Sequence, residues 1–586
     1  MLGSDESKKI FKQRVNIVLG VILFLFLGVV AKLFWLQIYD ANKYSLMSDR
    51  NRIRLSPVLP KRGKIFSADG KVLARCKNRY RLVIENCDRP TFIKNLNLLS
   101  ENLNFSEDDF QNFLEIRKKI PKYAPIIVKD DLSWDEYAKI SLNLYKLSNV
   151  SIENTYMREY TMPLEFSHVL GYAAKSDDAL QILEGKSGIE NVMDFDLKGQ
   201  VGNQQNEINA LGKKMRLLEF SSPINGSDVT LTVNSELQKY VYDVLSQEKA
   251  GACVVLNIKT KEVLAFVSVP GYDPNIWLSK ITQKQWNEIV NDPLKPFLNR
   301  VTGGVYPPGS IFKIVVAFAA INEGIISPRE KIFCGGEVKY DNATFHCWNR
   351  YGHGYVNLYD ALRMSCDCYF FEISRKLGID TIAKYAKRFG FGEVSDVEMP
   401  NENCGLMPTK TWKFLTYRTT WKPYETMITS IGQGALLSNL MQTATMMARL
   451  YTENYGFCPT LLKNKKSDEE EITRPMNHDT ATIIKEALFQ VCNSETGTAR
   501  RSCFTDYGIS GKTGSSQVRK IREGEAGKKQ SSFEWKYRDH ALFVGCASKK
   551  DPKFVVAVLV EHGGGGASVA APIARKIFDK IYELKL

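Results

Sequence analysis

The segment NIVLGVILFLFLGVVAKLFWLQIY, near the start of the chain, most restricts what the rest can become. From Val15 to about Gln37 its only charge is Lys32, and this length of apolar sequence suits a helix that spans a bilayer. Lysines and an arginine precede it, so the positive-inside rule keeps residues 1–14 in the cytoplasm and exports everything after the span. A cleaved signal peptide is the alternative, but the apolar run is longer than a signal needs and no small-x-small cleavage site follows. The sequence therefore predicts a single-pass anchor over residues 15–37.

The remaining chain is long enough for two large modules. At 586 residues it exceeds one ordinary domain, and the pattern of expected strands, helices and turns changes near residue 232. Residues 38–232 read as an elongated mixed module, and residues 233–586 as a second domain. The net charge of +14 is spread out, without the basic block interleaved with aromatics that a nucleic-acid surface requires. A membrane surface or an anionic polymer is the easier partner, and no nucleic acid is expected.

The second module begins and ends with the same pattern. AGACVVLNIKTKEVLAFVSVPGYDP predicts a hairpin after a helix that Asn234 caps. HALFVGCASKKDPKFVVAVLVEHGG predicts a second hairpin, followed by the helix VAAPIARKIFDKIYE. Strands at both ends of a domain with a helical middle indicate an α+β fold, in which helices cover an antiparallel sheet.

A serine and a lysine stand one helical turn apart in YPPGSIFK. The preceding Pro-Pro-Gly cannot continue a helix backwards, so we expect a helix to begin at about Ser310, with Lys313 on the same face. A buried, neutral Lys313 would accept the serine proton. The alternative is a helix cap beside a surface lysine, and S-x-x-K alone is too common to decide between them.

Two further motifs follow in the same domain. RMSCDCYFF contains Ser365-Cys366-Asp367, and GISGKTGSS contains Lys512-Thr513-Gly514 on a predicted strand. The order S-x-x-K, S-D-N, then K-T-G is typical of active-site serine enzymes that bind penicillin, and here the first and third motifs occur in order with the second in a variant form. Together the three motifs predict one catalytic cleft.

Nearly the whole chain resembles the class B penicillin-binding proteins, the monofunctional transpeptidases of the bacterial cell wall. The resemblance rests on PKRGKIFSADGKVLA, GKSGIENVMDFDLKGQVGNQQNEINALGKKMR, YPPGSIFK, SCDCYFFEISRKLGI, SIGQGALLSNLMQTA, GKTGSSQV and HALFVGCA. The chain is most similar to the elongation-type group, penicillin-binding protein 2. Asp367 departs from the S-x-N of many relatives, but elongation-type members also have S-x-D.

The resemblance and the chemistry together imply a role for each residue. Ser310 attacks the penultimate D-alanine of a stem pentapeptide, Lys313 is the base, and Ser365 relays a proton to the leaving amine. A second stem-peptide amine then takes the acyl group, whereas water would give carboxypeptidase activity. Asp367 is expected to orient the lysines and the substrate amide. Lys512, Thr513 and Gly514 are expected to bind the carboxylate of the substrate or of a β-lactam. By resemblance, the backbone N–H of Ser515 joins that of Ser310 in the oxyanion hole.

A second site is predicted between the first two motifs. Cys334, Cys347, His353 and Cys366 form C-x12-C-x5-H-x12-C, a closed set of three thiolates and an imidazole that suits one structural zinc. Elongation-type relatives bind zinc with aspartates at two of these positions. A Cys334–Cys347 disulfide, or unpaired thiols with His353 in a turn, are the alternatives.

The resemblance also implies location and partners. It places the protein in the inner membrane with the catalytic domain in the periplasm, and makes the first module a pedestal with a dimerisation region. A membrane-embedded glycosyltransferase of the shape, elongation, division and sporulation family and other elongation-complex proteins are the expected partners. Alternative functions are a division-type transpeptidase, a β-lactamase or β-lactam sensor, and a non-catalytic scaffold.

Overall fold

A computed structural model of the chain describes residues 4–44, 52–84, 87–100, 103, 105, 107–119, 125–176, 182–208, 214–278, 281–341, 343–463, 473–519 and 528–586. Its parts form two compact units that interleave in the sequence. Unit 1 comprises Met1–Pro60, Asn78–Tyr156 and Gln200–Ile224, and unit 2 comprises Lys61–Lys77, Met157–Gly199 and Asn225–Leu586. The units do not coincide with the predicted modules 38–232 and 233–586, because two segments before residue 200 belong to unit 2.

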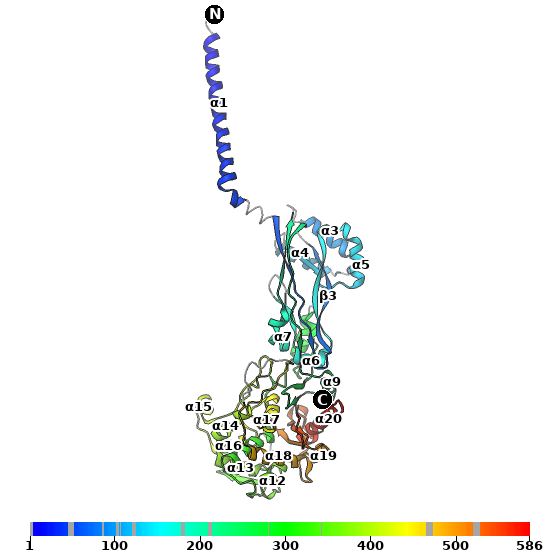
Figure 1. Ribbon diagram of the computed structural model, residues 1–586, viewed down its shortest axis with the longest axis vertical. Coiled ribbons are helices and arrows are strands. Elements are labelled where there is room, and N and C mark those ends of the chain that lie inside the picture. Colours follow the sequence, from blue (N-terminus) through cyan, green and yellow to red (C-terminus); the bar gives the residue numbers. More distant parts are fainter. Residues whose placement is uncertain are drawn as a thin grey trace. The chain divides into compact units, whose positions relative to one another are not determined.

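The N-terminal apolar segment is one long helix, as predicted. Helix α1 spans Ser4–Phe34 and continues as a π-helical stretch, η1, over Trp35–Tyr39 (Figure 1). Lys8–Tyr39 has a mean hydropathy of 2.8 in its most apolar window, and it is the one helix in the described ranges long and apolar enough to cross a membrane. Its apolar side chains, such as Phe24, are exposed, which suits a helix that lies in lipid.

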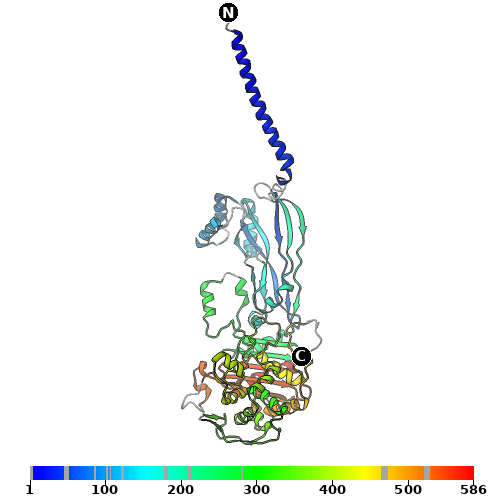
Figure 2. The ribbon, with the colours of Figure 1, turned by 90° about the vertical axis from the view of Figure 1, so that its left-hand side faces the viewer.

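Unit 1 contains a three-stranded antiparallel sheet and a small helical core. The sheet has the order β1-β8-β9, and Figure 2 shows blue β1 beside the much later strands β8 and β9. Phe92, Leu96, Ile126 and Ile140 form its separate hydrophobic core. Its elements are β1 (Ile53–Val58), α3 (Arg89–Ser100), α4 (Glu107–Lys119), β4 (Ile126–Lys129), α5 (Trp134–Asn143), η2 (Leu144–Lys146), β8 (Gly202–Ile208), β9 (Lys214–Ser221) and parts of β3 (Val72–Ile84) and β5 (Val150–Tyr160).

Unit 2 is built on the predicted antiparallel sheet. Its strands have the order β12-β11-β19-β18-β17, so the two predicted hairpins lie side by side and the strand with the third motif is at one edge. The strands are β11 (Gly251–Asn257), β12 (Val263–Val269), β17 (Ile509–Ser516), β18 (His540–Ala547) and β19 (Phe554–Val560). Asn234 caps α9 (Ser235–Leu245) through its side chain, as predicted.

Helices cover both faces of this sheet. Cys253 and Val255 pack with α9 and α20, whereas Ala252 and Val254 pack with the central helices, because successive strand residues point to opposite faces. The elements after β12 are η3 (Pro274–Leu278), α10 (Gln283–Val290), η4 (Gly309–Ile311), α11 (Lys313–Asn322), β13 (Ile332–Cys334), β14 (Glu337–Tyr340), β15 (Ala343–His346), β16 (Gly354–Val356), α12 (Leu358–Arg363), α13 (Asp367–Leu377), α14 (Ile379–Phe389), α15 (Lys410–Tyr417), α16 (Pro423–Ser430), α17 (Leu440–Thr452), α18 (His478–Asn493), α19 (Arg500–Cys503), η5 (Gln530–Ser532), η6 (Trp535–Tyr537), η7 (Gly566–Ala570) and α20 (Ala571–Glu583).

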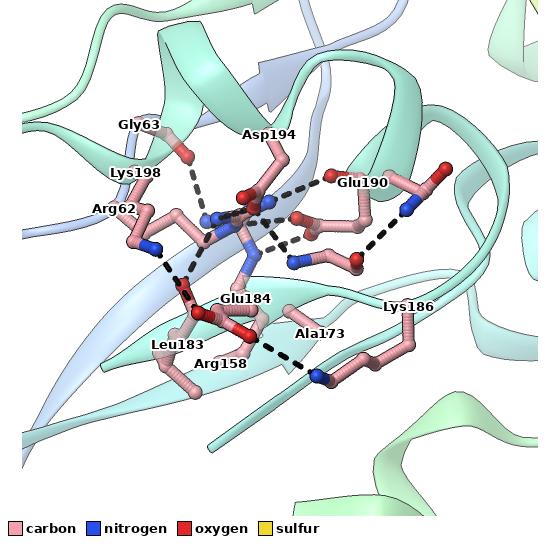
Figure 3. A network of polar contacts seen from close by, with 12 residues as sticks. Arg62, Gly63, Arg158, Ala173, Leu183, Glu184, Lys186, Glu190, Asp194 and Lys198 are labelled. Carbon is pink, nitrogen blue, oxygen red and sulfur yellow. Dashed lines mark hydrogen bonds and ion pairs between the residues drawn. The ribbon is translucent and has the colours of Figure 1, made fainter. Parts of the chain in front are cut away.

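A buried ion-pair network joins the earlier segments of unit 2. Glu190 accepts from Arg62 Nε at its Oε2 atom and from Arg158 Nε at its Oε1 atom, each at 2.6 Å, and all three side chains are almost fully buried. Arg62 also binds Asp194 at 2.6 Å (Figure 3). The surrounding elements are β2 (Ile65–Phe66), α6 (Pro163–Leu170), β6 (Ala173–Lys175), β7 (Leu183–Gly185), α7 (Gly188–Val192), α8 (Asp194–Lys198) and β10 (Val229–Thr230).

Candidate active site

Ser310 lies in a tight turn that leads into a buried helix. The 3-10 turn η4 covers Gly309–Ile311, and α11 begins at Lys313, one turn later than the predicted start at Ser310. Gly309 has φ +57, and a Cβ atom there would lie 2.8 Å from Ser515 O. A glycine is therefore needed at this position for the first motif to pack against the strand of the third.

The second motif sits between two helices in a strained backbone. Ser365 has φ +58, a left-handed conformation, directly after α12. Cys366 N donates to Ala361 O and Ser365 N donates to Leu362 O, the hydrogen-bond pattern of a Schellman motif. Glycine usually occupies the left-handed position of this motif, so a serine there indicates a constraint beyond helix termination.

Lys313 connects the first motif to the second. Its Nζ atom lies 2.6 Å from Asp367 Oδ1, 2.9 Å from Ser365 O and 3.2 Å from Ser365 Oγ. The side chain of Lys313 is fully buried. Asp367 is the first residue of α13, where the helix dipole favours a carboxylate. The left-handed backbone of Ser365 thus directs both its oxygens at one ammonium group.

Lys512 brings the third motif to the same point. Its side chain is fully buried, and its Nζ atom donates to Ser365 Oγ at 3.0 Å. Burial first, and the positive charge of Lys313 second, hold the pKa of the Lys512 amine well below its ordinary value. Ser365 Oγ therefore stands between two lysines, and the three motifs meet as the sequence predicts.

Ser310 is half-buried, and the hydrogen bonds of Lys313 run to Asp367 and Ser365 rather than to Ser310. The assignment of Lys313 as base stays a prediction. Ser515 is exposed on β17 beside Gly309, and its carbonyl accepts from Gln433 Nε2 at 3.2 Å.

Two contacts of the site lie outside the motifs. Thr498 lies in the loop after α18, and its Oγ1 atom is 3.3 Å from Thr513 Oγ1. Trp348 N donates to Asp367 Oδ2 at 2.8 Å. No sequence spacing identifies Thr498 or Trp348 as a site residue, because both reach the site through tertiary packing. The one sequence feature that could have indicated Trp348 is its position directly after the predicted metal ligand Cys347.

The four predicted metal ligands lie together. One donor atom from each of Cys334, Cys347, His353 and Cys366 is within 4.8 Å of all the others. His353 Nδ1 is 3.5 Å from the sulfurs of both Cys334 and Cys347. All twelve cysteines are free thiols, so the alternative Cys334–Cys347 disulfide is not formed.

Comparisons with known proteins cover nearly the whole chain. The family model described as Penicillin binding protein transpeptidase domain matches residues 251–579, and the Penicillin-binding Protein dimerisation domain matches residues 57–231. The peptidoglycan D,D-transpeptidase MrdA of Haemophilus influenzae is 32% identical over 98% of this chain and 92% of its own.

Two solved structures that match this chain come from a penicillin-binding protein and from a peptidoglycan synthase complex. Penicillin-binding protein 2 of Helicobacter pylori, in complex with MreC, matches with a TM-score of 0.81 and 26% identity over 91% of this chain and 99% of that one. A chain from a peptidoglycan synthase complex matches with a TM-score of 0.70 and 25% identity over 98% of both. Because a transpeptidase model covers more than half of the sequence and a close relative nearly all of it, this chain belongs to the penicillin-binding proteins, in the elongation-type penicillin-binding protein 2 group.

Proposed function

We propose that this protein is a membrane-anchored peptidoglycan D,D-transpeptidase that cross-links stem peptides during cell elongation. The observation that carries the proposal is the position of Ser365 Oγ, 3.2 Å from Lys313 Nζ and 3.0 Å from Lys512 Nζ. One hydroxyl from the second motif thus contacts the lysines of the first and third. This arrangement supports an acyl-transfer site, because it brings two candidate bases to one hydroxyl near the predicted nucleophile Ser310.

Acylation begins when Ser310 Oγ bonds to the carbonyl carbon of the penultimate D-alanine. The C–N bond to the terminal D-alanine breaks, and the leaving amine takes a proton. A second amine, from a neighbouring stem peptide, then attacks the ester and releases Ser310. A β-lactam acylates the same serine as its ring amide opens, and it inhibits the enzyme because the adduct remains covalent.

The two lysines and Ser365 provide the proton path. Burial and the charge of Lys313 lower the pKa of Lys512, which favours its neutral amine and leaves that amine free to take up a proton. Lys313 passes a proton through Ser365 Oγ to Lys512 and then accepts the proton of Ser310. Lys313 then passes the proton taken from Ser310 through Ser365 Oγ to the leaving amine, while protonated Lys512, with Thr513, binds the substrate carboxylate.

The chain also carries a candidate structural zinc site. In a tetrahedral zinc site with Zn–S near 2.3 Å and Zn–N near 2.05 Å, sulfur and nitrogen ligands lie about 3.6 Å apart. The 3.5 Å separations of His353 Nδ1 from two cysteine sulfurs support this geometry. We propose that Cys334, Cys347, His353 and Cys366 bind one zinc, which supplies structure only and holds Cys366 beside Ser365.

Location and partners follow from the anchor and the relatives. The basic residues before α1 support a cytoplasmic N-terminus, with the catalytic unit in the periplasm on the inner membrane. The Helicobacter pylori relative was solved with MreC and another in a peptidoglycan synthase complex. We propose a similar scaffold protein and a membrane-embedded glycosyltransferase as partners here.

The test uses the natural type of substrate. Full-length protein is incubated with polymerised glycan strands that carry pentapeptides, and the products are digested and separated by mass spectrometry. We expect cross-linked dimers and free D-alanine in equal amounts, both absent with Ser310→Ala. D-alanine release without dimers would make the enzyme a carboxypeptidase, and no release by the wild type would refute the proposal.

A further inference from the structure

Ser365 is held in a backbone conformation that a serine does not favour. It occupies the left-handed position after α12, where the last carbonyls of the helix lack partners within the helix. The peptide group that joins Met364 to Ser365 sets the direction of the serine. A group that holds the Met364 carbonyl therefore helps to fix the direction of Ser365, together with the hydrogen bond from Ser365 N to Leu362 O.

The indole of Trp348 holds this carbonyl. Its Nε1 atom donates to Met364 O at 3.1 Å. The ring is 60% exposed, so it contributes little buried area for its size. The ring also lies against that of His353, with 5.5 Å between the ring centroids, so the indole bridges His353 and the Met364 carbonyl.

The backbone of the same segment holds the other end of the motif. Trp348 N donates to Asp367 Oδ2 at 2.8 Å, and Cys347 Sγ accepts from Asp367 N at 3.4 Å. Residues 347 and 348 thus contact the motif at three points, on both sides of Ser365 and Cys366. Asp367 in turn binds Lys313 at 2.6 Å.

We propose that Trp348 is a positioning residue for the acylation step, which acts through its indole N–H on Met364 O and so on Ser365. The inference rests on the proposed function, because Ser365 is assigned there as the proton relay. Without the indole bond the Met364–Ser365 peptide is held only at its N–H, by Leu362 O, and Ser365 Oγ shifts from its place between Lys313 and Lys512. The hydrogen bonds of Trp348 in the described part of the chain run to Met364 O and Asp367 Oδ2, and not to Ser310 or the two lysines.

The exposure of the ring makes the proposal testable without unfolding the protein. Trp348→Phe removes the N–H donor and keeps an aromatic ring in a mostly exposed place. Replacement of Trp348 by 3-benzothienylalanine removes the same donor and keeps the ring shape. Tyr355→Leu is the control, since Tyr355 is a 70% exposed aromatic residue of β16 whose ring packs on Phe333 rather than on the second motif.

The measurement is the rate of acylation of full-length protein by a fluorescent penicillin, separated into the binding constant and the acylation rate constant. We expect both Trp348 variants to acylate about tenfold more slowly, with unchanged binding, as the loss of one hydrogen bond to the reacting assembly implies. Their melting temperature should stay within about 2 °C of wild type. Tyr355→Leu should behave as wild type.

The possible results separate this inference from the proposed function. Failure of the wild type to label at Ser310 would refute the transpeptidase itself. Wild-type labelling with an unchanged acylation rate in Trp348→Phe would overturn the positioning role alone. A loss in Trp348→Phe that the benzothienyl variant does not share would assign the effect to ring shape, which would also overturn it.

Discussion

Lys313 Nζ and Asp367 Oδ1 lie 2.6 Å apart, and both side chains are almost wholly removed from solvent. A charge pair at this depth tolerates the loss of one partner poorly, because the remaining charge has no water to solvate it. Asp367→Ala should lower the stability of the catalytic unit by about 3–5 kcal/mol in urea unfolding, and it should also slow acylation. Asp367→Asn keeps the shape but removes the same charge, so it should cost nearly as much as Asp367→Ala. A stability close to wild type in Asp367→Asn would contradict a buried ion pair.

Lys512 gives the site a pH-dependent stability. Its folded-state pKa is lowered by burial and by Lys313, so between that value and the ordinary one of 10.5 the unfolded chain binds a proton that the folded chain does not. Stability should therefore rise with pH through this window. Lys512→Met should be more stable than wild type at pH 7, by a margin that shrinks as pH approaches about 10. Urea unfolding from pH 7 to 9.5 measures the margin, and a constant difference would show that Lys512 titrates alike in both states.

The buried network around Glu190 should be the main polar support of the earlier part of unit 2. Glu190 binds the guanidinium groups of both Arg62 and Arg158. Glu190→Ala leaves two buried cations without a carboxylate and should cost about 3–5 kcal/mol. Glu207→Ala is a suitable control, because the arginines paired with Glu207 are exposed and such pairs contribute about 0–1 kcal/mol. Similar losses in the two variants would remove the special role of the network.

The zinc proposal makes a prediction about composition. Purified protein should contain about one zinc per chain, and His353→Ala should lose it. His346→Ala should keep the metal, since His346 is an exposed histidine of β15 that lies outside the ligand set. Chelation should lower the melting temperature of the catalytic unit by roughly 5–10 °C. Metal-free wild-type protein with an unchanged melting temperature would refute the site.

The parts of the structure that sequence could predict are those set by local patterns. The hairpins β11–β12 and β18–β19 follow from apolar runs around short turns, and α1 follows from an apolar stretch of membrane length. The order of the three motifs, and the spacing of the cysteines and His353, likewise needed only the chain itself.

What sequence could not predict depends on segments brought together by folding. Glu190 meets arginines 32 and 128 residues away, and no local pattern marks that contact. The left-handed backbone of Ser365 follows from how α12 ends, at a position where a glycine would be expected. The ion pair of Lys313 with Asp367 likewise depends on the packing of α11 against α13, and it changes the chemistry expected of that lysine.

The most direct test of the proposed mechanism is acylation at Ser310. Full-length protein is incubated with a fluorescent penicillin, and the labelled peptide is identified by mass spectrometry. We expect one stable adduct per chain on Ser310 and none on Ser310→Ala. Absence of an adduct on the wild type, equal labelling of Ser310→Ala, or rapid release of the hydrolysed drug would contradict it.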